Sequence, residues 1–217
     1  YRNGDNGAWK SPQWLIPSNE NKDKVSNYSM YFDGVGDRVS LASSVNLGIN
    51  STISLWVKLD SGYNGTMIGE SSYGSSYLLY AKEDISFYIR IGGVPVQFPL
   101  MVTQIPKLTS GAWHNIVIQR SGDSIEVFLD GASKQTKTGF GTSVDTLFDT
   151  FGSGSTGIDP TEGLIDEVAG WNNNTVNPVD IYNLGTPTDL SLLATPPINW
   201  YRNGDNGSWK SPQWLIP

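Results

Sequence analysis

The sequence predicts an all-β protein, an antiparallel sandwich of two sheets with at most one short helix. Apolar and polar residues alternate with period two in several stretches, and clusters of turn-forming residues separate these stretches about every 8–12 residues. Of the 217 residues, 12% are aromatic and only 16% are charged, and there are 24 Gly and 12 Pro. Few charges, many aromatics and many turn formers are typical of a β-protein with polar, uncharged surfaces.

The expected strands follow one another along the first four fifths of the chain. Residues 28–32 and 38–41 flank a turn rich in Gly and Asp, and residues 53–59 place Ile, Leu, Val and Leu on one face. Residues 124–129 alternate in the same way and end at Asp130-Gly131, which favours a tight hairpin turn. Further strands are expected at 77–81, 85–91, 113–119 and 163–171.

One helix is expected after the last long strand. Asn177 suits the N-cap, Pro178 suits the first helical position, and Gly185 would end a helix over 179–184. The Thr- and Pro-rich stretch 186–200 that follows predicts a partly ordered linker.

A repeat is the strongest signal in the sequence. Residues 1–17 (YRNGDNGAWKSPQWLIP) and 201–217 (YRNGDNGSWKSPQWLIP) match at sixteen of seventeen positions, and only Ala8 and Ser208 differ. The offset of 200 residues is the size of a domain, whereas solenoid repeats are typically about 20–50 residues long. We therefore expect one period of a tandem array plus the start of the next. The alternative is a duplicated edge strand that closes one domain at both ends.

The repeat suggests a division of the chain into four parts. Residues 1–17 would end an inter-repeat connector, 18–185 would form the sandwich, 186–200 the linker, and 201–217 the second copy of the connector, which starts the next repeat. The connector is interpreted as structural, with an aromatic sugar platform and a metal loop at Asp5 as alternatives. Contacts between repeats are expected from Trp9, Trp14, Trp200, Tyr201, Trp209 and Trp214.

Charge and composition exclude several classes of function. The net charge is −7, which argues against nucleic-acid binding because such proteins need a basic face to neutralise phosphates. No apolar run approaches the roughly 18 residues that would span a bilayer, so membrane insertion is not expected. The chain has no cysteine, and therefore neither a disulfide nor a catalytic thiolate.

Four segments carry a resemblance to a known family. They are YSMYFDGVGDRVSL (28–41), ISLWVKLD (53–60), LTSGAWHNIVIQRSGDSIEVFLDG (108–131) and GLIDEVAGWN (163–172). In order and spacing the chain resembles the concanavalin A-like, laminin-G-like family, which includes pentraxin-like jelly rolls, over about residues 28–185. The resemblance implies a jelly roll of two antiparallel sheets, binding of sugars, glycosaminoglycans or proteins at a rim or concave face, and often one structural calcium ion. The fold alone does not imply a function, because it also carries hydrolases and inert spacers.

No catalytic residue is expected. Retaining glycosidases need two carboxylates about 5 Å apart. Enzymes on the resembled fold carry them as Glu-x-Asp-x-(x)-Glu, and this pattern is absent from the sequence. Adjacent Glu83 and Asp84, and the odd-spaced pair Glu162 and Glu167, would face opposite sides of a strand. His114 is the only histidine, and we interpret it as a structural residue that bonds a neighbour. The sequence thus predicts a protein that is not an enzyme.

Calcium is the metal that the sequence suits best, because it prefers carboxylate and carbonyl oxygens. Asp33 and Asp37 lie on a Gly-rich turn, and Asp166 and Glu167 lie on the late strand that, in the resembled family, pairs near the first. We expect these four side chains to form one structural calcium site. The alternative is that Asp33 and Asp166 accept hydrogen bonds from backbone N–H groups at strand ends.

Sugar binding would use aromatic faces together with amide and hydroxyl groups. Two loops have the Tyr, Ser, Gly and Asn composition that is common in adaptable binding surfaces. The expected ligand-binding residues are Tyr63, Asn64, Tyr73, Tyr77 and Tyr80. The alternative is that about half of the rings fill the core.

Three functions follow from these observations. The first is a non-catalytic extracellular carbohydrate-binding or adhesion module in a tandem array, on the surface of a bacterial or archaeal cell or of a virion such as a phage. Its partners would be glycans or cell-surface polymers and neighbouring copies of the repeat. The second is a structural repeat that assembles head-to-tail into a fibre. A glycoside hydrolase is the least favoured alternative.

Overall fold

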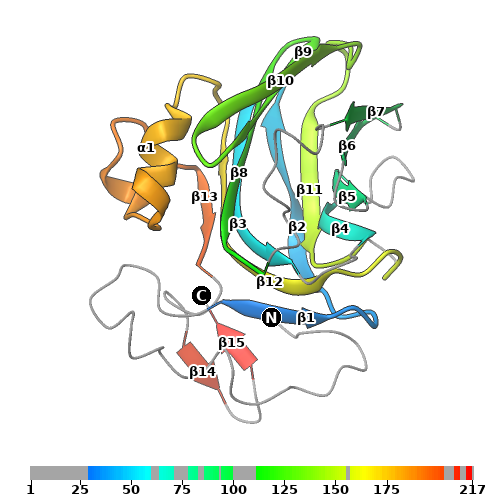
Figure 1. Cartoon of the computed structure of the whole chain (residues 1–217), viewed down its shortest axis with the longest axis vertical. Helices are drawn as coiled ribbons and strands as arrows, with labels where there is room; N and C mark the ends of the chain where they lie inside the picture. The colour runs from blue at the N-terminus through cyan, green and yellow to red at the C-terminus, as the bar shows by residue number, and fades with distance from the viewer. Residues whose placement is uncertain are drawn as a thin grey trace.

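The computed structural model describes residues 29–59, 64–70, 78–82, 86–92, 94–99, 111–154, 157–202, 208–210 and 214–216. These residues form two antiparallel sheets that pack face to face, as the sequence predicts (Figure 1). The seven-stranded sheet contains β1 (Met30–Asp33), β12 (Glu162–Trp171), β3 (Asn50–Leu59), β8 (His114–Ser121), β9 (Ser124–Leu129) and β10 (Ala132–Thr138) in spatial order, with β13 (Asn199–Tyr201) also paired to β12.

The second sheet has six strands among the described residues. In spatial order they are β2 (Val39–Gly48), β11 (Thr146–Phe151), β4 (Asn64–Gly69), β5 (Leu79–Lys82), β6 (Ser86–Ile91) and β7 (Val94–Pro99). A separate hairpin joins β14 (Ser208–Lys210) to β15 (Trp214–Ile216), at the bottom of the view in Figure 1. The hairpin belongs to the second copy of the 17-residue repeat.

The core lies between the two sheets and follows the alternation of the sequence. Along β9, Ile125, Val127 and Leu129 are buried while the residues between them are half-buried. The apolar row of β3 points into the same core, and Trp56 on the opposite face stacks on Tyr182 at 5.9 Å between ring centroids. Each large apolar side chain that is removed from water contributes about 1.5–3 kcal/mol.

Arg120 is a buried cation that ties the seven-stranded sheet to β11. Its guanidinium donates to the Thr146 hydroxyl at 3.1 Å and to the carbonyl oxygens of Gly122 and Gly141, each at 2.9 Å. Burial lowers the pKa of Arg120 from its ordinary value, and the nearby carboxylates of Asp145 and Asp123 oppose this shift. The donors of this buried cation are satisfied by oxygen atoms, as stability requires.

The helix forms close to its expected position but is shorter. It is α1 (Pro178–Tyr182), and Asn177 caps it by accepting from the Val179 N–H at 3.2 Å. The predicted end at residue 184 is wrong, because Asn183 and Leu184 adopt left-handed φ values of 44° and 56° and a 3₁₀ turn, η2 (Asn183–Gly185), follows. No helix among the described residues is long and apolar enough to cross a membrane.

The segment after the helix lies on the outer face of the seven-stranded sheet (Figure 1). A second 3₁₀ turn, η3 (Leu190–Leu192), buries Leu190, and the Trp171 indole N–H donates to the Thr195 carbonyl at 2.8 Å. The helix and this segment form an apolar cluster with the outer face of the sheet. The buried residues of the cluster are Val117, Ala169, Trp171, Val176, Ile181 and Leu190. The stretch expected as a linker therefore contacts the sandwich on its way to β13.

Candidate binding site

β2 contains a large bulge. In its ladder with β11, Val45 pairs with Phe148 and Ser40 pairs with Thr150, so that residues 41–44 lie opposite Asp149 alone. Bulges bend a strand and redirect its side chains. Residues 42–44 are exposed here, on a strand that ends the six-stranded sheet.

β13 lies at the matching edge of the other sheet. It pairs with β12 through Val168 with Tyr201 and Gly170 with Asn199. The Tyr201 ring packs edge-on against Phe151, at 5.2 Å between centroids, and against Phe148 at 6.4 Å. These contacts fix the Tyr201 ring at the margin of the core.

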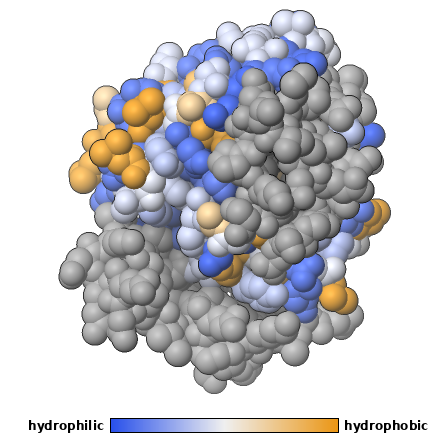
Figure 2. Space-filling model, in the orientation of Figure 1, coloured by the Kyte–Doolittle hydropathy of each residue, from blue (hydrophilic) through white to orange (hydrophobic). Residues whose placement is uncertain are grey.

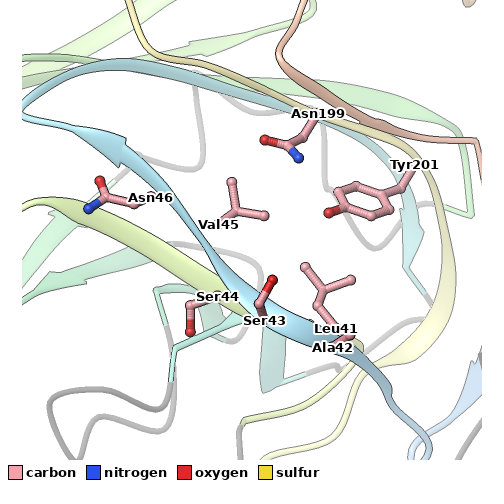
Figure 3. Close-up of a pocket in the computed structure, with 8 residues that line it drawn as sticks. All are labelled: Leu41, Ala42, Ser43, Ser44, Val45, Asn46, Asn199 and Tyr201. Carbon is pink, nitrogen blue, oxygen red and sulfur yellow. The ribbon is translucent and has the colours of Figure 1, made fainter.

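A hollow of about 310 Å³ lies between the β2 bulge and β13 (Figure 3). Its lining combines hydroxyl and amide groups with an aromatic ring and a few aliphatic side chains. The lining residues are Leu41, Ala42, Ser43, Ser44, Val45, Asn46, Asn199 and Tyr201. No carboxylate is among the described residues that line it.

Some side chains of the lining point into the hollow and others point away from it (Figure 3). In Figure 3 the Asn199 amide and the Tyr201 ring point from β13 toward β2, and Ser43 points back toward them. Ser44 and Asn46 point away, and each hydrogen-bonds an acid on or beside β11: the Ser44 hydroxyl donates to Asp149 at 3.3 Å, and the Asn46 amide donates to Asp145 at 2.9 Å. The Asn199 amide, the Ser43 hydroxyl and the Tyr201 ring therefore face the same space.

A second hollow, of about 290 Å³, shares the bulge with the first. Ser40, Asp149 and Thr150 line its other side. The Asp149 side chain is nearly buried, with 9% of the residue exposed. The bulge thus separates one hollow without an acid from a second hollow with an acid at its base.

β12 also carries a bulge, and this one is buried. Its register with β3 shifts between Asp166 and Ala169, and Glu167 adopts a φ of 50° with 2% of the residue exposed. The Glu167 carboxylate accepts a hydrogen bond from the Trp200 indole N–H, and its other oxygen lies 3.4 Å from Arg202 Nε. The Arg202 guanidinium carbon lies 4.8 Å from the centre of the Trp200 ring. We call Glu167, Trp200 and Arg202 the clasp.

The fold agrees with a comparison of the sequence with protein families. The profile described as the concanavalin A-like lectin/glucanases superfamily matches residues 32–181. The chain belongs to this superfamily. No curated protein sequence matches the chain.

Solved structures show the same fold at low sequence identity. A heptameric SAP-like pentraxin from Limulus polyphemus is 11% identical at a TM-score of 0.53, over 71% of this chain and 81% of the pentraxin. The binding domain of botulinum neurotoxin serotype D is 15% identical at a TM-score of 0.56, over 84% of this chain and 46% of that domain. A Bacteroides ovatus protein described as a candidate carbohydrate binding protein is 13% identical at a TM-score of 0.54, over 83% of this chain and 51% of that protein.

The matched structures differ from this chain in length and in how they are described. The chain spans about half the length of the toxin domain and of the Bacteroides protein. The neighbours named above are described as a pentraxin and as binding domains or proteins, whereas the superfamily description also includes glucanases. Catalysis in a concanavalin A-like domain must therefore be judged from its carboxylates.

The structure does not bring the four carboxylates of the expected calcium site together. Asp33 pairs with Glu162 across β1 and β12, and Asp166 lies four residues farther along β12, about 13 Å away at about 3.3 Å per residue. Among the described residues, no group of three or more His, Cys, Asp or Glu could hold a metal ion. The structure thus does not group the four residues at one place, and the structural calcium ion stays a prediction.

Hydrogen bonds to the backbone account for two of these carboxylates. Asp33 accepts from the Val35 N–H at 2.8 Å, and Asp166 accepts from the Glu167 N–H, also at 2.8 Å. Asp37 lies 3.3 Å from the Asp33 backbone nitrogen, which donates to it. The alternative that the sequence left open, in which Asp33 and Asp166 satisfy backbone N–H groups at strand ends, matches the contact of Asp33, which ends β1, whereas Asp166 accepts its bond in the middle of β12.

Most of the tyrosines expected to bind ligand lie outside the described residues. These are Tyr63, Tyr73 and Tyr77. Asn64 and Tyr80 are placed by their backbone in β4 and β5, where Thr66 pairs with Tyr80. Their role in ligand binding stays a prediction, and the hollow beside β2 is a site that the sequence did not suggest.

The aromatic residues expected between repeats fall into three groups. Trp9 and Trp14 lie outside the described residues, and Trp209 and Trp214 lie in the β14–β15 hairpin. Trp200 and Tyr201 contact the sandwich that precedes them in the chain. Of these two residues only Tyr201 belongs to the second copy of the repeat, and β13 ends on it.

The histidine and the carboxylates that could have served in catalysis differ in burial and in their contacts. His114 is buried, with Nδ1 2.8 Å from an Asp130 carboxylate oxygen, which confirms the expected bond to a neighbour. Glu162 is exposed, whereas Glu167 is buried in the clasp. Glu83 and Asp84 lie outside the described residues.

Proposed function

We propose that the chain is a non-catalytic carbohydrate-binding module of an extracellular tandem array, and that the hollow between the β2 bulge and β13 holds the saccharide. The lining of that hollow carries the proposal: a Ser hydroxyl, an Asn amide and a Tyr ring converge on one space. Amide and hydroxyl groups bond sugar hydroxyls, while an aromatic ring covers the apolar face of the sugar. The carbohydrate-binding description of the Bacteroides neighbour supports the same class of ligand.

The size and chemistry of the hollow suit a small saccharide. Its volume of about 310 Å³ lies at the low end of the range of about 300–1,000 Å³ that is usual for ligand sites. Glycoside hydrolysis requires a general acid and a second carboxylate flanking the bond, and the described lining contains neither. We therefore propose binding without bond cleavage, at the surface of a bacterial or archaeal cell or of a virion.

A glycan array tests this proposal. The full chain is displayed on a multivalent carrier, because single sites of this type bind weakly and multivalency raises the apparent affinity. The Asn199→Ala variant should lose about fivefold to tenfold in affinity for the best saccharide, the value of one or two hydrogen bonds. Ser121→Ala, on an exposed serine at the end of β8, is the matched control and should bind like the wild type. Binding that Asn199→Ala leaves unchanged would contradict the site, and binding to no glycan would contradict the function.

A fibre-forming repeat is the second candidate, and exposed apolar side chains favour it. Figure 2 shows hydrophobic residues gathered over α1 and the turns that follow it, and Val179, Leu184 and Leu192 are 52%, 92% and 81% exposed. Exposed apolar patches often mark contacts between proteins. Filaments of the full chain in electron micrographs, together with a blank glycan array, would favour the fibre.

A further inference from the structure

The 17-residue repeat and the folded domain do not share a boundary. The second copy of the repeat begins at Tyr201, but β13 runs from Asn199 to Tyr201 and pairs with β12 of the preceding sandwich. Arg202, the second residue of the copy, contacts Glu167 on the same strand. The first two residues of the copy are therefore part of the domain before it.

The contacts of Tyr201 belong to the core of that domain. Its ring meets Phe148 and Phe151 of β11, both of them fully buried, so it bridges the seven-stranded sheet to the six-stranded one. An aromatic ring in such edge-on contacts contributes packing in addition to the area that it buries. Without Tyr201, this margin of the core would be open to solvent.

The clasp gives Arg202 a similar role. Glu167 is 2% exposed, and a buried carboxylate is costly unless it is paired and hydrogen-bonded. The Trp200 indole and the Arg202 guanidinium both reach it, one from each side of Tyr201. The Glu167 carboxylate is thus satisfied by two side chains. Trp200 directly precedes the second copy of the repeat, and Arg202 is its second residue.

We propose that the slot formed by Glu167, Phe148, Phe151 and the β12 backbone is a docking site for the start of the following repeat, so that a second copy of the repeat completes each domain of the array. The Tyr-Arg pair occurs at both Tyr1-Arg2 and Tyr201-Arg202. Each copy of the motif thus carries the residues that close the domain before it. The occupant of the slot is a segment of the neighbouring repeat.

This arrangement restricts where the β14–β15 hairpin of the second copy can lie. Only residues 203–207 separate Arg202 from β14. Six residue steps span at most about 21 Å when fully extended. The β14–β15 hairpin of the next repeat therefore stays within that distance of the clasp.

The two copies of the motif provide a matched experiment in the full 217-residue chain. Tyr201→Ala should lower the melting temperature by about 5–10 °C, because it removes a ring from the margin of the core. Tyr1→Ala changes the same residue of the same motif, but a sample of these 217 residues contains no sandwich on the N-terminal side of Tyr1 for that ring to close. It should change the melting temperature by less than about 1 °C.

A second pair covers the case in which Tyr201→Ala does not fold. Arg202→Ala should lower the melting temperature by about 2–6 °C, while Arg2→Ala should leave it unchanged. Amide hydrogen exchange of the wild type should also be slow at 199–201, as it is for a paired strand. Equal effects within each pair would support instead a motif that closes one domain at both ends, and would overturn the proposal. Unprotected exchange at 199–201 would overturn it as well.

Discussion

The bulges of β2 and β12 have opposite surroundings. The β2 bulge exposes residues 42–44 and adjoins two hollows. The β12 bulge buries Glu167 and uses its carboxylate to hold β13. β13 connects the two, since Asn199 and Tyr201 face the hollow while Trp200 enters the clasp. The comparison indicates that the β12 bulge holds β13, which forms one wall of the hollow, while the β2 bulge forms the opposite wall.

The largest expected effect comes from breaking the clasp. Glu167→Ala removes the partner of both Trp200 and Arg202, and should lower the free energy of unfolding by about 2–4 kcal/mol. Ser43→Ala on the exposed bulge should change it by less than about 0.5 kcal/mol. Urea denaturation of the two variants measures the difference. Similar losses in both would show that the bulges do not differ in the way described.

Shortening the exposed β2 bulge should have a smaller effect on stability. It should instead lower the affinity for the saccharide. Deleting Ala42 and Ser43 leaves two residues opposite Asp149 and keeps the Val45–Phe148 pair. The free energy of unfolding should change by less than about 1 kcal/mol, whereas saccharide affinity should fall at least about tenfold because one side of the hollow is removed. Calorimetric titration and urea denaturation measure the two quantities. A deletion variant that binds as tightly as the wild type would place the site elsewhere.

The sequence predicts the sandwich well where side chains alternate. In β3 and β9 each apolar residue faces the core because successive side chains on a strand point to opposite faces. In β2 the expected strand ended at residue 41, whereas the structure continues the strand to Gly48 and places a bulge at residues 41–44. The bulge comes from pairing with β11, a strand that the sequence pattern did not reveal.

The candidate site was less predictable than the fold. β13 has three residues, too few for a periodic pattern, and its position depends on a carboxylate in another strand. The parity argument treated β12 as a regular strand, but its bulge places Glu167 in a left-handed conformation. The same bulge and the four-residue separation along β12 explain why Asp33, Asp166 and Glu167 are not grouped at one place. A one-residue irregularity changes which face a side chain occupies.

The most direct measurement is a nuclear magnetic resonance titration of the ¹⁵N-labelled full chain with the saccharide that binds best on the array. The account predicts that the largest shifts occur in the amides of residues 41–44, Asn199 and Tyr201, which line the hollow from both sheets. Shifts confined to the loops that contain Tyr63 and Tyr73 would contradict the proposed site, and an unchanged spectrum would contradict saccharide binding.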